Sequence, residues 1–216
     1  MFDKNKTAAI VAEFFGTFVL ASAVLAMITK IGIPYFAATT AGLVLATMVL
    51  VIGGISGSHI NPAVTVGFWS VKKISSAQAI VYIAAQLLGG LCAWRVAEYF
   101  LQQALPNIAG KSFDWRIMLA EALGTFIFTF GIAAAVNQGF DGGKLSAAIG
   151  ISLTIGIIIA SMASNGVLNP AVALGIHSYS LSYVLGPLVG GVLGMNVYQY
   201  VFHIEPVVKK STTSKK

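Results

Sequence analysis

The chain has 216 residues, of which 57% are apolar and only 9% are charged, and its mean hydropathy is +0.85. A soluble domain carries about 25% charged residues, so this chain has too few polar side chains to face water on all sides. The composition excludes an ordinary soluble protein and indicates that a lipid bilayer is its solvent. The net charge of +6 comes from the ends of apolar stretches and a basic tail, which argues against nucleic acid as a partner.

Six apolar stretches are long enough to cross about 30 Å of hydrocarbon. The sequence predicts membrane-spanning helices at these positions: 7–29, 35–55, 75–99, 115–136, 145–163 and 181–203. Two shorter apolar stretches, 61–70 and 169–178, follow the second and the fifth spans. At about 1.5 Å per residue, each reaches only half-way through a bilayer. They are predicted to be re-entrant half-helices, which are tolerated only where protein or a water-filled cavity surrounds them.

The chain repeats itself with one constant offset. The pattern Ala-Glu-x-x-Gly-Thr-Phe begins at Ala12 and again at Ala120, and Asn-Pro-Ala-Val begins at Asn61 and again at Asn169, an offset of 108 residues in both cases. Each half holds three spans and one half-helix, and an odd number of spans makes the second half insert upside down. The sequence therefore predicts one all-α membrane domain over 1–216 with an inverted repeat, whose site lies near the midplane. The repeats cover about 7–100 and 115–203.

The lysines and arginines predict the orientation of the chain. With the N-terminus inside, nine of these residues face the inner side and four face the outer side, so we expect both termini to be cytoplasmic. The inner set is Lys4, Lys6, Lys72, Lys73, Lys144, Lys209, Lys210, Lys215 and Lys216, and the outer set is Lys30, Arg95, Lys111 and Arg116. Residues 204–216 then form a basic cytoplasmic tail. No sorting signal is recognisable, so we expect the plasma membrane of a microbe.

The two Asn-Pro-Ala motifs, Asn61-Pro62-Ala63 and Asn169-Pro170-Ala171, are predicted to begin the half-helices. Asn is a favoured N-cap, and Pro suits the first helical turn because it lacks an N–H. The inverted repeat brings both helix starts together near the bilayer centre. Two positive dipole ends and two amide donors then face one point, an arrangement that repels cations and tolerates neutral molecules.

Taken together, the paired Asn-Pro-Ala motifs, the run Ser56-Gly57-Ser58-His59-Ile60-Asn61 and the Ala-Glu-x-x-Gly-Thr-Phe openings resemble the aquaporin (major intrinsic protein) family. The resemblance covers about 8–202. It implies six spans around two half-helices, a homotetramer with one pore per subunit, and a passive channel for water or small neutral solutes in the lipid bilayer. Backbone carbonyls of the irregular segments are expected to line the pore: Gly57, Ser58, His59, Asn165, Gly166 and Val167.

Glu13 and Glu121 are ionisable residues inside predicted spans, which are costly there and usually functional. In proteins that this chain resembles, the matching glutamates accept hydrogen bonds from the re-entrant loops. We therefore favour a bracing role for both residues over a proton relay.

Counting along the family pattern places the selectivity filter at Ala41, Ile157, Gly166 and Val172. Most relatives carry Arg where this chain has Val172, and Arg would supply a fixed charge and several donors. Small side chains at Ala41 and Gly166 should widen the opening toward glycerol, urea, ammonia, hydrogen peroxide or undissociated metalloid acids. Two alternatives stay open: an apolar constriction that empties of water and closes, and a water pore in which Val172 changes little.

Other classes of protein share parts of this pattern. An ion-coupled secondary transporter also uses inverted repeats and broken helices, but only two glutamates are available as buried ion ligands. A structural membrane tetramer with a closed pore is the second alternative. We expect no enzyme, because the sequence shows no catalytic pair, metal cluster or cofactor-binding motif.

Overall fold

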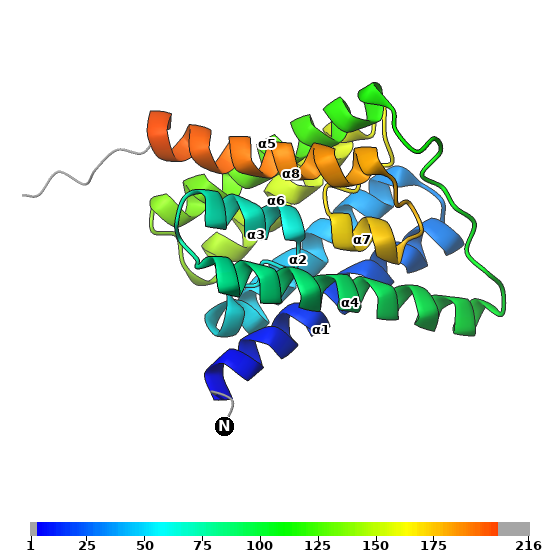
Figure 1. Ribbon diagram of the computed structural model, residues 1–216, viewed down its shortest axis with the longest axis horizontal. Coiled ribbons are helices and arrows are strands. Elements are labelled where there is room, and N and C mark those ends of the chain that lie inside the picture. The colour runs from blue at the N-terminus through cyan, green and yellow to red at the C-terminus, as the bar shows by residue number, and fades with distance from the viewer. Residues whose placement is uncertain (1–3, 203–216) are drawn as a thin grey trace, which may run out of the picture.

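Residues 4–202 are described by the computed structural model, and among them the chain is helical with no strand (Figure 1). The helices are α1 (Lys4–Lys30), α2 (Pro34–Ser56), α3 (Pro62–Ser70), α4 (Ser76–Leu101), α5 (Trp115–Asn137), α6 (Gly142–Ala160), α7 (Pro170–Gly175) and α8 (Leu181–Val197), which the π-helical turn η1 (Tyr198–Phe202) extends. Six of them are long and apolar enough to cross a membrane, while α3 and α7 are half-length or shorter. The predicted all-α membrane fold is confirmed. The basic tail predicted at 204–216 lies outside the described residues.

Local chemistry explains where several helices begin and end. The Asp114 carboxylate accepts a hydrogen bond from the backbone N–H of Arg116 at 2.8 Å, which caps α5. Helix α2 begins with Pro34 and ends at Gly57, whose φ of +89° is strained for residues with a side chain.

Two helices end before the predicted position. The fifth span, predicted at 145–163, ends at Ala160, where the backbone turns away from the helix axis. The second half-helix, predicted at 169–178, covers only Pro170–Gly175, and the chain reverses at His177 with a φ of +57°. Apolar and polar residues alternate through both turns, so hydropathy alone does not show where the helices stop.

Glycine pairs in α4 and α8 allow the two halves to interlock. A Cβ at Gly89 would strike the backbone of α1, and one at Gly190 would strike the backbone of α5. The neighbouring Gly90 and Gly191 contact the backbones of α7 and α3 in the same way. Each half therefore supplies the long helix against which the other half's short helix packs, and the contacts repeat with the internal symmetry of the sequence.

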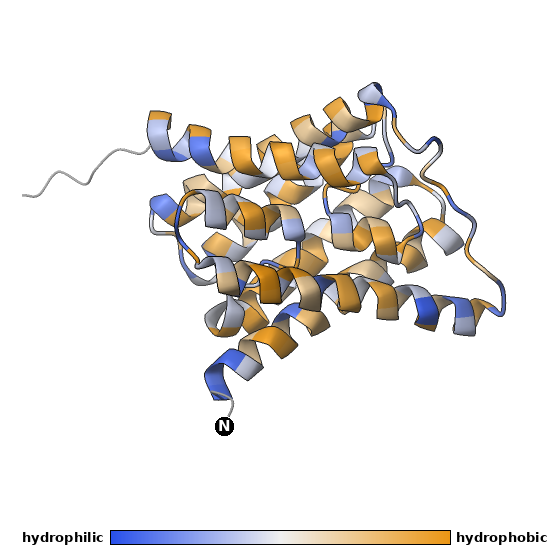
Figure 2. Ribbon diagram, in the orientation of Figure 1, coloured by the Kyte–Doolittle hydropathy of each residue, from blue (hydrophilic) through white to orange (hydrophobic). Residues whose placement is uncertain are grey.

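The outer surface of the bundle is apolar. Large side chains such as Leu43, Phe100 and Met162 are 70%, 75% and 78% exposed, and Figure 2 shows apolar residues along most of the helices. Water would not stabilise such a surface, whereas lipid chains or another subunit would. The chain is therefore an integral membrane protein.

Candidate functional site

The two asparagines of the Asn-Pro-Ala motifs start the short helices. The side-chain Oδ1 of Asn61 accepts a hydrogen bond from the N–H of Ala63 at 2.8 Å. Asn169 caps α7 in the same way, accepting from Ala171 at 3.0 Å and from Val172 at 3.2 Å. Each side-chain oxygen is thus used as a cap, and each side-chain N–H₂ group is left to face elsewhere.

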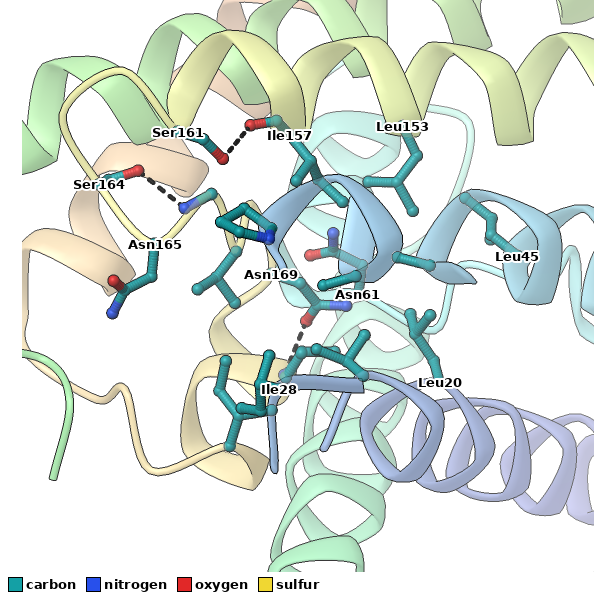
Figure 3. Close-up of a pocket in the computed structure, with 18 of the residues that line it drawn as sticks. Leu20, Ile28, Leu45, Asn61, Leu153, Ile157, Ser161, Ser164, Asn165 and Asn169 are labelled. Carbon is teal, nitrogen blue, oxygen red and sulfur yellow. Dashed lines mark hydrogen bonds between the residues drawn. The ribbon is translucent and has the colours of Figure 1, made fainter. Parts of the chain in front are cut away.

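The short helices are joined end to end by these same amides. Asn61 Nδ2 donates to the carbonyl of Leu168 at 2.9 Å, and Asn169 Nδ2 donates to the carbonyl of Ile60 at 2.9 Å. Both asparagines line a central cavity, and Figure 3 shows them next to each other. An amide nitrogen carries two hydrogens, so each asparagine keeps one N–H available to a molecule in that cavity.

Glu13 holds the first re-entrant loop from inside the bundle, where it is 0% exposed. Its carboxylate accepts hydrogen bonds from the backbone N–H groups of His59 and Ile60 at 2.9 and 2.6 Å. It also accepts from Ser56 Oγ at 2.6 Å and from Gln86 Nε2 at 2.7 Å. Four donors around one carboxylate compensate its removal from water. Because these hydrogen bonds hold the N–H groups of the loop toward Glu13, the carbonyl groups of the loop are free to face a cavity.

Glu121 makes the matching contacts in the second half and is also 0% exposed. It accepts from the N–H groups of Val167 and Leu168 at 2.9 and 2.7 Å, and from Ser164 Oγ at 2.7 Å. The geometry is that of a loop brace. Neither glutamate is among the residues that line the cavities described below.

A cavity of ≈ 250 Å³ lies between the helices and the second re-entrant loop. All four residues predicted as the filter line it, namely Ala41, Ile157, Gly166 and Val172. Among residues 4–202, none of those that line it is an Asp, Glu, Lys or Arg. A charged solute entering this cavity would lose its hydration without gaining a counter-charge, whereas a neutral solute would not pay that cost.

Sequence reasoning missed most of the apolar wall of this cavity. Three helices contribute rows of side chains spaced four residues apart. These rows are Leu20, Val24 and Ile28 of α1, Ala37, Ala41 and Leu45 of α2, and Leu153 and Ile157 of α6, which Ser161 continues at the C-cap. Residues four apart lie on one face of a helix, so the predicted positions Ala41 and Ile157 were a signal from which their neighbours could have been found.

Gly166 lines the outer cavity and also makes a close approach to α6. Its φ is +61°, and a Cβ there would lie 2.5 Å from Ser161 Oγ and 2.8 Å from the carbonyl oxygen of Ile157. The missing side chain would therefore point at the end of α6. Glycine at this position lets the second re-entrant loop pack closely against α6 while the backbone of Gly166 lines the cavity.

A second cavity of ≈ 650 Å³ lies on the side of the first re-entrant loop. Of the residues whose carbonyl groups were predicted to line the pore, Gly57, Ser58 and His59 line this inner cavity, while His59, Asn165, Gly166 and Val167 line the first, outer cavity. All six predicted positions therefore border a cavity, and His59 borders both.

The fold has six apolar spans and two short helices that meet at their N-termini, and the outer cavity runs past that meeting point to the inner cavity. This arrangement defines a membrane channel. The family model described as "Major intrinsic protein" matches residues 2–198, and the chain belongs to this family. It is a passive channel for water or small neutral solutes, as expected from the resemblance.

Several relatives support this assignment. The chain is 36% identical over 187 residues to aquaporin AqpM of Methanothermobacter marburgensis, which covers 74% of each chain. It is 33% identical over 217 residues to aquaporin NIP3-1 of Oryza sativa subsp. japonica, covering 92% of this chain and 70% of the relative. The X-ray structure of the aquaglyceroporin from Plasmodium falciparum shares the fold with a TM-score of 0.73 at 23% identity, over 91% of this chain and 97% of that chain.

Proposed function

We propose that this channel passes small neutral solutes such as glycerol and urea together with water, and that it excludes cations and protons. The observation that carries the proposal is the outer cavity, which contains the four predicted filter residues and which no described Asp, Glu, Lys or Arg lines. Ala41 and Val172 stand where bulkier or charged residues would narrow the path, and a charge-free wall does not discriminate among neutral solutes by charge.

The exclusion of cations is assigned to the centre of the channel. There the N-termini of α3 and α7 meet, and Asn61 and Asn169 each have one amide N–H without a partner in the capping and cross-loop bonds. Backbone N–H groups and amide donors present positive partial charge to the cavity. A water molecule held there by two donors points its own hydrogens outward, which interrupts a chain of proton transfers.

The remaining site roles follow from the same geometry. Glu13 and Glu121 brace the re-entrant loops, and the loop carbonyls accept hydrogen bonds from the solute as it moves from one position to the next.

The channel assembles as a homotetramer in the plasma membrane of a microbe with both termini cytoplasmic. The family resemblance supports the assembly, the exposed apolar helix faces leave surface for it, and the lysine distribution supports the orientation.

The experiment that tests passive conduction is solute uptake into proteoliposomes with and without proton and sodium gradients. A channel predicts that glycerol and urea equilibrate at the same rate in all conditions. A rate or a final accumulation that follows either gradient would overturn the proposal in favour of a secondary transporter, and uptake no faster than in empty liposomes would favour a closed structural tetramer.

A further inference from the structure

The two cavities meet at three side chains. The outer cavity runs from Ile33 and Ile108 at one end, past all four predicted filter residues and both asparagines, to Leu45, His59 and Phe128. The inner cavity begins at these same three residues, and within 4–202 the two cavities share no other. The predicted filter therefore does not interrupt the path, whereas Leu45, His59 and Phe128, here named the inner ring, stand where one cavity ends and the next begins.

The internal repeat supplies a built-in comparison for the inner ring. With the offset of 108 residues, the counterparts of Phe128, Leu45 and His59 are Leu20, Leu153 and Val167, here named the outer ring. All three outer-ring residues line the outer cavity, which continues past them, and Figure 3 shows Leu20, Leu45 and Leu153 on one side of the asparagine pair. The inner ring carries a phenyl and an imidazole group where the outer ring carries only aliphatic groups. The symmetry is therefore broken toward a bulkier and more polar inner ring.

The imidazole of His59 is held firmly in this position. It is stacked on Phe68 with ring centroids 4.7 Å apart, and it meets Tyr82 edge to face at 5.4 Å. Its Nδ1 lies 3.2 Å from Thr65 Oγ1, and only 6% of the residue is exposed. A side chain packed on two aromatic rings and hydrogen-bonded at one nitrogen has little freedom to move out of the path.

The hydrogen bonds of Thr65 indicate which ring nitrogen of His59 carries the proton. The Thr65 hydroxyl donates to the Asn61 carbonyl at 3.0 Å and accepts from Gln86 Nε2 at 2.9 Å. With the single hydroxyl hydrogen of Thr65 assigned to the Asn61 carbonyl, Nδ1 of His59 is the donor in its contact with Thr65. Nε2 is then a bare acceptor, and it has no hydrogen-bond partner in residues 4–202. The counterpart of Thr65 in the second half is Ala173, which cannot hold such a bond.

We propose that the inner ring, and not the predicted filter, is the constriction that determines which solutes pass, with His59 Nε2 accepting a hydrogen bond from the solute there. This inference rests on the proposed function of a neutral-solute channel. The bulk of Phe128 limits the width of the solute. The imidazole nitrogen favours molecules with an O–H or N–H group, because a solute without one would leave Nε2 unpaired as it passes.

The repeat offers a matched pair of substitutions to test the size limit. Leu45→Ala widens the inner ring and Leu153→Ala makes the same change at the equivalent point of the outer ring. We expect the single variants Leu45→Ala and Phe128→Leu each to raise the ratio of glycerol to water permeability about fivefold or more. Leu153→Ala should leave the ratio within about twofold of the unsubstituted protein. Size-exclusion chromatography checks folding, and Phe128→Met replaces an inner-ring variant that fails to assemble.

The outcomes separate this inference from the function on which it rests. An unchanged ratio in the inner-ring variants, or an equal rise in Leu153→Ala, would overturn the inner ring as the constriction while the unsubstituted channel still conducts. If the unsubstituted protein conducts neither water nor glycerol above the liposome background, the proposed function itself fails.

A second readout tests the acceptor role of His59. Solid-state ¹⁵N NMR in lipid bilayers, with the His59 signals assigned by comparison with His59→Val, should show a protonated Nδ1 and an unprotonated Nε2. Thr65→Val removes the acceptor for Nδ1 and should produce a mixture of both tautomers, together with a several-fold lower water permeability. A proton on Nε2 in the unsubstituted protein, or an unaltered spectrum in Thr65→Val, would overturn the assignment.

Discussion

Asn61 Nδ2 lies 2.9 Å from the carbonyl oxygen of Leu168, 107 residues later in the chain. The bond is one of a reciprocal pair, because Asn169 donates to the carbonyl of Ile60 at the same distance. Each half-helix is therefore attached to the loop that precedes the other one. Both halves contribute to the central site, so a substitution in one half-helix should alter the position of the loop in the other half.

Replacing either asparagine by aspartate should weaken the exclusion of cations. Asn61→Asp or Asn169→Asp puts a negative charge beside the helix N-termini and removes the donor to the opposite loop. We expect potassium conductance in planar bilayers to rise about tenfold or more. Asn107→Asp is the control, since Asn107 also caps a backbone N–H, that of Ala109, but lies outside both cavities. Conductance at background in both central variants would contradict the assigned barrier.

Glu13→Gln should destabilise the fold more than the equivalent amide substitution of an exposed carboxylate would. Glutamine presents one acceptor oxygen, whereas Glu13 receives donors on both oxygens, from Ile60 and Gln86 on one and from Ser56 and His59 on the other. Leaving buried donors unpaired costs roughly 2–4 kcal/mol. Thermal unfolding in detergent should show a clear loss in melting temperature. Asp141→Asn is the control, because Asp141 is exposed and its side chain makes no cap hydrogen bond. An equal melting temperature for Glu13→Gln and the unsubstituted protein would argue against the brace.

The packing of Gly166 on α6 can be separated from its backbone angle. Gly166→Ala adds a Cβ in contact with Ser161 and Ile157 at a φ of +61°, while Gly139→Ala adds one at a φ of +69° with nothing within 4 Å. Both changes destabilise the fold by about 1 kcal/mol because alanine is strained at a positive φ. Only Gly166→Ala should lose several kcal/mol more through overpacking. Equal unfolding temperatures for the two variants would show that the close approach has no energetic weight.

Val172→Arg should narrow the selectivity of the outer cavity. The side chain of Val172 lines that cavity, and an arginine there adds bulk, donors and a fixed positive charge. We expect glycerol and urea permeability to fall about tenfold while water permeability falls less. Val172→Leu adds bulk without charge and serves as the control. Glycerol flux that is unaffected by the arginine would show that Val172 does not face the route of the solute.

Sequence reasoning predicted the spans well because a bilayer imposes a length and an apolar composition that are readable in one dimension. It failed where a turn is set by distant partners. Ser164, for example, follows the end of α6 and donates to Glu121, 43 residues away in sequence. Nothing in the hydropathy of that segment distinguishes such a turn from the last residues of a span.

The same difference holds within the candidate site. The asparagines and glutamates stood out because polar residues in apolar stretches are rare and the motif is repeated. The inner-ring residues Leu45 and Phe128 did not, because a leucine or phenylalanine in a spanning helix is ordinary until the cavities show which face of the helix it occupies. His59 was placed in the pore by its backbone, while the importance of its ring depends on Thr65 and Gln86, which only the fold brings to it.

Stopped-flow light scattering on proteoliposomes, with sucrose, glycerol and urea as alternative osmotic challenges, tests the central claim most directly. A channel for small neutral solutes predicts fast shrinkage in all three, followed by re-swelling in glycerol and urea as the solute enters. Fast shrinkage without re-swelling would contradict it, because the protein would then be a water channel that does not admit larger solutes.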